Sequence, residues 1–223
     1  MPETRRKRLS ATERRRIILR AALDEFASTG FDGASMDRIA TASGVSKPVL
    51  YDHFASKLAL YTAALEHVRE QLLALGAGGV RENRVGIDAV RAAALAFFNF
   101  VSSDPTSIRV LLQTPNGSGD AIEAARRVQE IATAGIARLL ASVVTLEPMQ
   151  LQLAAEYHKT GLHSLARQLL EHPELDPGAL ADLATRLIWL GLSKPDRPTI
   201  RSSQAVSVPS AKSGSSKAGR RGA

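Results

Sequence analysis

The 223-residue sequence contains no cysteine, so disulfide bonds and thiolate metal sites are excluded. It also lacks a long apolar run, because the uncharged central stretch Ala92–Val101 is too short to cross a membrane. The arginine-rich N-terminus is not followed by the apolar segment of a secretion signal. No stretch alternates between apolar and polar residues in the manner of a strand. These absences favour an all-α protein that works in the cytoplasm and not at a membrane.

The net charge is +7, and the excess of positive charge lies at the two ends of the chain. Residues 1–60 hold 11 Lys and Arg against 7 Asp and Glu, whereas residues 61–200 hold 13 against 15. Residues 201–223 hold 5 against none. A basic head on a slightly acidic body indicates a polyanionic partner for the head, while solvated charge also explains the tail.

The stretch from Ser35 to Lys57 has the pattern of two short helices joined by a turn. Ser35 and Ser46 each stand at an N-cap position before apolar residues at helical spacing. Between the helices, Gly44 can adopt the left-handed conformation that a steep turn requires. Pro48 falls in the first turn of the second helix, where its missing N–H costs nothing. The pattern predicts a helix-turn-helix whose second helix suits a DNA major groove.

Together with residues 16–31, this stretch resembles the N-terminal DNA-binding domain of the TetR family of bacterial transcriptional repressors. The family pattern Gly-Val-Ser-x-x-x-Leu-Tyr-x-x-Phe-x-x-Lys is met by Gly44, Val45, Ser46, Leu50, Tyr51, Phe54 and Lys57. The resemblance implies a homodimeric repressor that binds a palindromic operator in double-stranded DNA and is released by a small molecule. It also implies DNA contacts by Ser35, Ser46, Lys47, Pro48, Tyr51, His53 and Lys57.

The chemistry of these side chains agrees with DNA contact. Lys47 can reach a phosphate or a guanine edge, and Lys57 can add a phosphate clamp, while the hydroxyl groups and the imidazole can donate to phosphate oxygens. Val49 departs from the rest, because its apolar side chain suits a thymine methyl group and forms no hydrogen bond with a base. The alternative is that the two serines only cap helices and Tyr51 only packs. Both roles can coexist, since a cap uses an acceptor lone pair and leaves the hydroxyl proton free.

Four parts of the chain are expected from the pattern of helices and charges. These are a flexible basic arm over residues 1–9, a DNA-binding domain over 10–57, a helical ligand-binding and dimerisation domain over 58–195, and a disordered basic tail over 196–223. A capping box at Ser10 and Glu13 begins a support helix that Gly30 ends. A long helix over Leu58–Leu75 follows the helix-turn-helix, and the glycine cluster Gly76–Gly79 predicts a loop after it. Further helices are expected at about 85–103, 106–113, 120–144, 147–170 and 176–193.

Large apolar side chains of the second domain form a candidate ligand pocket. The three phenylalanines within residues 97–100 cannot all face one side of a helix, so at least one is expected to line a cavity. The predicted walls are Phe97, Phe98, Phe100, Leu111, Leu112, Tyr157 and His158. A pocket of this kind favours an acyl or other lipid-like effector, or a hydrophobic drug. The stretches over residues 97–112 and 175–192 resemble those of family members that sense acyl or lipid-like ligands, more weakly than the head resembles the family. The alternative is that the large apolar side chains only pack in the core.

The last two expected helices supply the predicted dimer interface. Their apolar and small positions suit the packing of one helix on another between two copies of the chain. The residues predicted to form the interface are Leu165, Leu180, Leu183, Leu187 and Gly191.

No residue pattern indicates catalysis, a metal or a cofactor. The five histidines include no pair at the i, i+4 spacing of a helical zinc site, and Gly161–Leu165 lacks the second glycine of a nucleophile elbow. We therefore expect no enzyme activity and no cofactor. Two other classes stay open, a small-molecule enzyme with an appended helix-turn-helix and a helical adaptor that binds nucleic acid without specificity.

Overall fold

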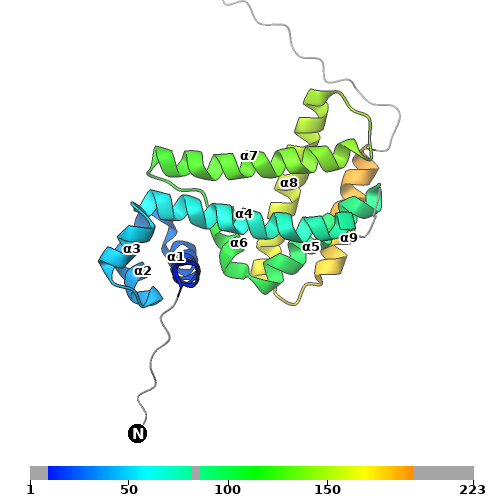
Figure 1. Cartoon of the computed structure of the whole chain (residues 1–223). Coiled ribbons are helices and arrows are strands. Elements are labelled where there is room, and N and C mark those ends of the chain that lie inside the picture. Colours follow the sequence, from blue (N-terminus) through cyan, green and yellow to red (C-terminus); the bar gives the residue numbers. More distant parts are fainter. Residues whose placement is uncertain (1–9, 82–85, 193–223) are drawn as a thin grey trace, which may run out of the picture.

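The computed structural model of the chain describes residues 10–81 and 86–192, and these residues form nine α-helices with turns between them (Figure 1). The prediction of an all-α fold is confirmed. The helices are α1 (Ala11–Gly33), α2 (Met36–Ser43), α3 (Lys47–His53), α4 (Lys57–Arg81), α5 (Ile87–Ser103), α6 (Pro105–Leu112), α7 (Gly119–Ala141), α8 (Pro148–Glu171) and α9 (Pro177–Leu192). The expected arm and tail lie outside the described residues.

The first three helices form the head, and their ends follow the predicted signals. Ser10 and Glu13 make a reciprocal capping box at the start of α1. Near the other end, Gly30 has a φ of 69° and breaks the helical geometry, so the last residues of α1 form a separate short turn. Ser35 caps α2 by accepting hydrogen bonds from the N–H groups of Asp37 and Arg38.

The α4 helix leaves the head and runs through the body, where α7 packs along it (Figure 1). Its length corrects the prediction of a loop at Gly76–Gly79, because α4 continues through these glycines to Arg81. A glycine in a helix costs only about 1 kcal/mol relative to alanine, so a helix already several turns long can extend through a few of them. The predicted boundary between the two domains, after Lys57, falls at the first residue of α4.

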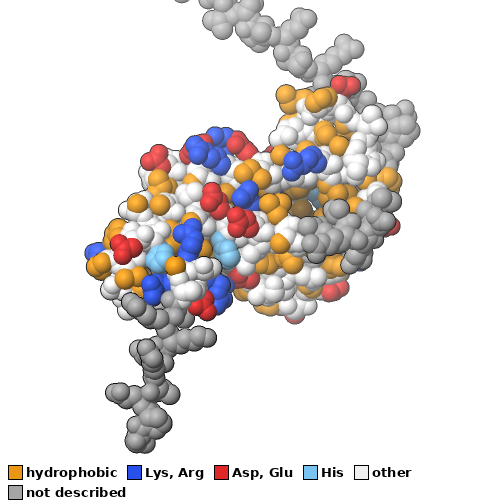
Figure 2. Space-filling model, in the orientation of Figure 1, with side chains coloured by type: hydrophobic (Ala, Val, Ile, Leu, Met, Phe, Trp, Pro, Cys, Tyr) orange, Lys and Arg blue, Asp and Glu red, His pale blue; other side chains and the backbone are white. Residues whose placement is uncertain are grey.

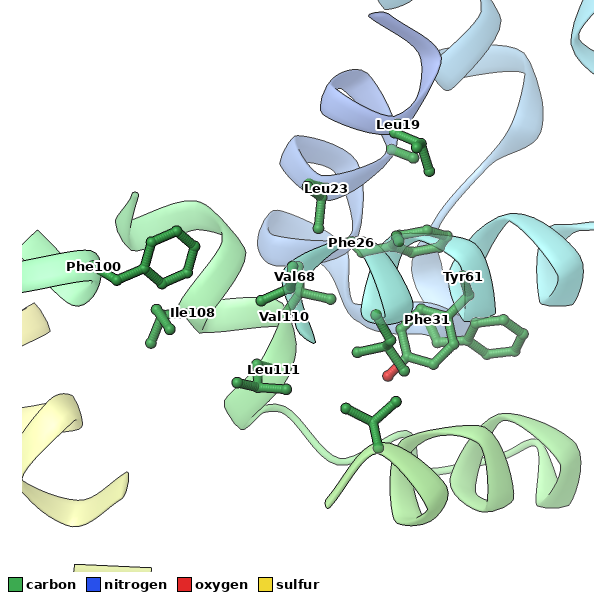
Figure 3. Close-up of a cluster of buried hydrophobic side chains, with 14 of the residues drawn as sticks. Leu19, Leu23, Phe26, Phe31, Tyr61, Val68, Phe100, Ile108, Val110 and Leu111 are labelled. Carbon is green, nitrogen blue, oxygen red and sulfur yellow. The ribbon is translucent and has the colours of Figure 1, made fainter. Parts of the chain in front are cut away.

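One hydrophobic core joins the head to the body. An aromatic cluster forms between Phe26 and Phe31 of α1 and Tyr61 of α4, and its ring centroids lie 5.0–6.3 Å apart. Figure 3 shows this cluster beside Val68 of α4 and Val110 of α6, so three helices meet here. Burial is the main cause that raises the pKa of Tyr61 to about 12, and the negative charge of Asp32 adds to it. The same core extends into α5, α7, α8 and α9.

The remaining helices build the body around the far half of α4. The α5 helix packs on α9, α7 packs on α8, and a second small core of Val90, Leu140, Ala155 and Ile188 lies at the end away from the head. In the described parts of the chain, no helix is both apolar enough and long enough to cross a bilayer. The helices of the body thus pack mainly on one another, while α4 and α6 contact α1 of the head.

Candidate nucleic-acid interface and ligand cavity

The turn of the helix-turn-helix has the geometry that the sequence predicts. Gly44 ends α2 with a φ of 67° and a ψ of 23°, a left-handed conformation that strains any residue with a side chain. Its N–H lies 3.1 Å from the carbonyl oxygen of Thr41, and the N–H of Val45 donates to Ala40. These bonds close α2 and turn the chain into α3, where Pro48 lies in the first turn.

The α3 helix presents most of its residues to solvent. Only Leu50 among its seven residues is buried. Of the predicted DNA contacts on this helix, Lys47, Pro48 and Tyr51 are exposed, while Val49 and His53 are half-buried. Ser46 occupies the N-cap position but its side chain makes no capping bond, so its hydroxyl group is exposed and available to a ligand. The ammonium of Lys47 lies 2.8 Å from the carboxylate of Asp37, and both side chains are largely exposed.

A network of charged groups fixes the start of α2 against α1. The carboxylate of Glu25 accepts a hydrogen bond of 2.7 Å from Nε of Arg38 and one of 3.0 Å from the N–H of Ser35. Arg38 also donates to the carbonyl of Gly33 at 2.7 Å. The hydrogen bond from Arg38 is the main cause that lowers the pKa of Glu25 below its ordinary value. Ser35 is thereby held in place by both its backbone and its side chain.

Lys57 is the predicted DNA contact that the structure places differently from the others. Its ammonium donates to the carbonyls of Asp32 and Ala34, each at 3.1 Å, and lies 4.7 Å from the centroid of the Phe31 ring. Two of its three N–H donors therefore tie the start of α4 to the segment between α1 and α2. One donor remains for any other partner.

A cavity of about 470 Å³ lies in the body between α4, α5, α7 and α8, with one residue of α6 also in its wall. This volume falls within the range of about 300–1,000 Å³ that ligand sites occupy. Leu73 of α4 and Ile131 of α7 line it while remaining 51% and 41% exposed, so its mouth lies between these helices. Figure 2 shows a hollow with apolar walls on this face of the molecule.

The wall of the cavity is mostly apolar, and α7 supplies much of it through residues at helical spacing. Three of the residues predicted for the pocket, Phe97, Leu111 and His158, line the cavity. Phe98 and Phe100 are instead buried in the core, Leu112 is half-buried against that core, and Tyr157 is 75% exposed on the surface. The three phenylalanines do face different sides of α5, but Phe97 is the one that reaches the cavity.

Residues of α7 and α8 line the cavity that were not among the predicted pocket residues, although their spacing in the sequence is that of a helix face. Val128, Ala132, Gly135 and Leu139 recur at spacings of three and four on α7, and all four line the cavity. On α8, Lys159 and His163 also line it and were not predicted. A charged residue and a histidine four positions apart lie on the same face of a helix, so their spacing predicts a polar face. The spacing does not show that this face lines the cavity.

The cavity is connected to the head through α6. Leu111 of α6 lines the cavity, and the carbonyl of the same residue accepts a hydrogen bond from Gln129 of α7 at 3.1 Å. Three side-chain contacts join the residues before and after α6 to α1. They are Arg20 to Asp104 at 2.9 Å, Gln113 to the carbonyl of Ala27 at 2.9 Å, and Asp32 to the N–H groups of Asn116 and Gly117 at 3.1 Å each. These contacts fix the position of α6 relative to that of α1.

An apolar stripe runs along the outer face of α8 and α9. On α9, Leu183, Leu187 and Leu190 are 43%, 60% and 59% exposed at spacings of four and three. On α8, Leu153 and Tyr157 are 46% and 75% exposed. Among the residues predicted for the dimer interface, Leu183, Leu187 and Gly191 lie on exposed positions, whereas Leu180 is buried and Leu165 is half-buried against the core.

The described residues contain no group of three or more His, Cys, Asp or Glu side chains placed to hold a metal ion. The structure thus combines an exposed helix α3 on a helix-turn-helix head with an apolar cavity in a helical body. The helix-turn-helix defines a transcription regulator of that class.

Comparison with known proteins identifies the family. Residues 18–64 match the family model described as bacterial regulatory proteins, tetR family. Over 139 residues the chain is 32% identical to the HTH-type transcriptional repressor Rv1474c of Mycobacterium tuberculosis, a match that covers 62% of this chain and 70% of that protein. The chain belongs to the TetR family, whose members are DNA-binding transcription regulators and not enzymes.

Other relatives and solved structures agree with this assignment. The HTH-type transcriptional activator FasR of Mycolicibacterium smegmatis is 41% identical over 106 residues, so the match spans 48% of each chain, about half of this relative's length. A TetR-like transcriptional regulator from Rhodococcus sp. RHA1 superposes with a TM-score of 0.70 at 26% identity, covering 82% of this chain and 98% of that one. The regulator FadR from Bacillus subtilis, solved in complex with stearoyl-CoA, has the same fold at 14% identity, with a TM-score of 0.69 over 79% and 98% of the two chains.

The position of Lys57 generates a prediction about stability. Lys57→Met keeps the length of the side chain but removes two hydrogen bonds to carbonyls, so we expect the free energy of unfolding to fall by about 1–3 kcal/mol. Lys47→Met, which breaks only an exposed ion pair, should leave the stability nearly unchanged. Urea denaturation of both variants measures the difference, and equal stability of the two would show that the Lys57 contacts do not stabilise the head.

Proposed function

We propose that this protein is a homodimeric repressor that binds a palindromic operator and leaves it when a hydrophobic small molecule enters the body. The observation that carries the proposal is the apolar cavity of about 470 Å³, which includes Leu111 of α6, because the two residues that cap α6 are hydrogen-bonded to α1 of the head. Because the DNA of a bacterium lies in its cytoplasm, the proposal includes that the protein works there. The similarity to Rv1474c, which is named a repressor, supports the repressor role. FasR is named an activator, so the alternative is activation that depends on the ligand.

In this proposal the DNA-binding unit is residues 10–57, and the ligand-binding and dimerisation unit begins with α4. The exposed residues of α3 enter the major groove, with Lys47, Tyr51 and His53 at phosphates or base edges and Val49 against a thymine methyl group. The exposed hydroxyl of Ser46 and the N–H groups at the start of α3 suit a phosphate oxygen. Ser35 acts mainly by capping α2, as it does in the structure. The remaining N–H donor of Lys57 contacts a phosphate of the DNA backbone.

Removal of the Lys47 ammonium tests the interface. We expect Lys47→Ala to weaken specific operator binding by about 1–3 kcal/mol if the side chain reaches a base, or to reduce the salt dependence by about one counterion if it reaches a phosphate. Fluorescence anisotropy with an operator and a scrambled duplex at several salt concentrations distinguishes these cases. Arg91→Ala, which removes a positive charge from the body, serves as the control. Unchanged affinity and salt slope for Lys47→Ala would remove this residue from the interface, and equal affinity for scrambled DNA would favour the non-specific adaptor.

Dimerisation is needed because a single recognition helix makes too few contacts for a specific site. The apolar stripe of α8 and α9 supports a two-fold interface, since a surface of this kind is rare on a monomer and suits the packing of helices against their copies. Leu183, Leu187 and Gly191 of the predicted set lie on this stripe, and Tyr157 and Leu190 join them in the proposed interface. Leu165 and Leu180 support it from below.

A charge placed in the stripe should separate the dimer. We expect Leu187→Arg to give a monomer in sedimentation analysis and to abolish tight operator binding, because an unpaired guanidinium would be buried between the subunits. Ile122→Arg, at a position that is 42% exposed on α7, is the matched control and should leave the dimer intact. A stable dimer of Leu187→Arg with native operator affinity would place the interface elsewhere.

Release of the operator by hydrophobic molecules is the direct test of the proposed function. A ligand shifts the protein between two states only by binding them with different affinity, and the apolar wall favours compounds with a long hydrocarbon chain or a hydrophobic ring system. Hexadecanol, palmitic acid and palmitoyl-CoA should include a compound that dissociates the operator complex, whereas glucose and adenosine should not. Ala132→Trp, which fills the cavity, should bind the operator but no longer respond. Dissociation by the polar compounds alone, or by none of them, would contradict the proposal.

A further inference from the structure

The α8 wall of the cavity carries three polar side chains, His158, Lys159 and His163, while Arg69 of α4 and Gln129 and Arg138 of α7 are the other polar residues of the lining. His158 and Lys159 are each only 7% exposed, whereas the lining residues Leu73 and Ile131 at the mouth are half exposed. His158 and Leu162 share one face of α8, and Lys159 and His163 share the adjacent face, so two neighbouring rows of the helix form this wall. The polar groups of this wall are therefore more deeply buried than the apolar side chains at the mouth.

The ammonium of Lys159 is already engaged by the protein. Its Nζ lies 2.8 Å from the hydroxyl of Thr133, 2.9 Å from the carboxylate of Glu156 and 3.5 Å from the carbonyl of Gln129. These partners match its three N–H donors and its charge. The hydrogen bond from Lys159 is the main cause that lowers the pKa of Glu156, so this carboxyl group stays ionised beside the ammonium. Lys159 thus adds little positive charge to the cavity.

The imidazoles of His158 and His163 have no hydrogen-bond partner among the described residues, although both line the cavity. Within the described ranges, the only fully enclosed polar side-chain atoms without a partner are Nε of Arg69 and Oε1 of Gln71, so the imidazole nitrogens still face open space. Burial lowers the pKa of each histidine to about 4, and the charges of Lys159 and Arg167 contribute at His163. At neutral pH each ring is uncharged and offers one N–H donor and one acceptor nitrogen.

We propose that His158 and His163 form the hydrogen-bonding end of the cavity and select an apolar ligand that carries one uncharged hydroxyl group. The inference rests on the proposed function and specifies the ligand of that same cavity. A hydroxyl both donates and accepts, which matches two neutral imidazoles whose nitrogens are otherwise left unpaired in an apolar wall. The ring of Phe97, 6.2 Å from that of His163, packs beside the same end of the ligand.

Ionised head groups fit this end less well. A carboxylate at this wall would have to replace Glu156 at Lys159, because the other two cationic residues of the lining, Arg69 and Arg138, lie on α4 and α7. The phosphates of a CoA ester would lie outside the mouth, where a second hollow shares Arg69 and Ile131 with the cavity. That hollow is lined by the acidic residues Glu66, Asp120 and Glu123 against Arg69 and Arg127, so it offers a polyphosphate no net positive charge.

Matched ligands separate the head group from the chain. Hexadecanol and its methyl ether differ by one donor, and the full-length protein should bind the alcohol about tenfold more tightly in a fluorescence displacement assay. His158→Phe and His163→Phe should each remove this preference while retaining the ether. His172→Phe, an exposed position beyond the end of α8, is the control for the histidine substitution, and Arg69→Met tests whether the polar contact lies at the mouth instead. Imidazole nitrogen chemical shifts of the wild-type protein, measured by NMR with each ligand, should change with the alcohol and not with the ether.

The outcomes distinguish the inference from the proposed function. Equal affinity for alcohol and ether, tighter binding of palmitic acid or palmitoyl-CoA than of the alcohol, or loss of the preference only in Arg69→Met would each overturn the inference while the cavity remains a ligand site. Failure of every hydrophobic compound to bind the wild-type protein would overturn the proposed function as well. Unchanged imidazole shifts on alcohol binding would contradict the inference even if a histidine variant does not fold.

Discussion

The packing of α1 against both α4 and α6 is the constraint on which the rest of the structure depends. Phe26 and Phe31 bring α1 onto Tyr61 of α4, and these rings are continuous with Val110 of α6 in a single core. Aromatic pairs of this kind contribute about 0.5–1.5 kcal/mol each beyond the area that they bury. Because head and body share this core, the position of the recognition helix depends on the position of helices that line the cavity.

Polar contacts restrict how that shared core can move. Hydrogen bonds that Arg20 and Gln113 donate and that Asp32 accepts hold the residues on both sides of α6 to α1, while Lys57 holds the start of α4 on the end of α1. The head is therefore a rigid unit attached at two places, and a ligand that displaces Leu111 or Phe97 acts on one of those attachments. In the proposed mechanism, this displacement changes the separation of two recognition helices in the dimer, which must match the spacing of the DNA half-sites.

The head was predictable because its signals are local. The left-handed Gly44, the cap at Ser35 and the capping box at Ser10 each act within a few residues, and the periodicity of the helices located nearly all the others. The prediction of a loop at the glycine cluster after Leu75 was wrong, because the low helix propensity of glycine is a weak preference and α4 continues through it. Pocket residues were harder to assign, since the choice between Phe97 and Phe98 depends on how α5 is rotated against α7, α8 and α9. The exposed position of Tyr157 likewise depends on tertiary packing, because an aromatic residue on an apolar helix is equally consistent with burial.

The central claim is that occupation of the cavity changes the distance between two recognition helices, and spin-label spectroscopy measures that distance. The absence of cysteine from the chain allows one label to be placed in each subunit through Asp52→Cys, an exposed position on α3. Without ligand, the account predicts a distance distribution that includes the spacing of one DNA turn, about 34–36 Å, or a multiple of it. Addition of a hydrophobic ligand that releases the operator should move the distribution away from that spacing. The same distribution with and without such a ligand would contradict the account.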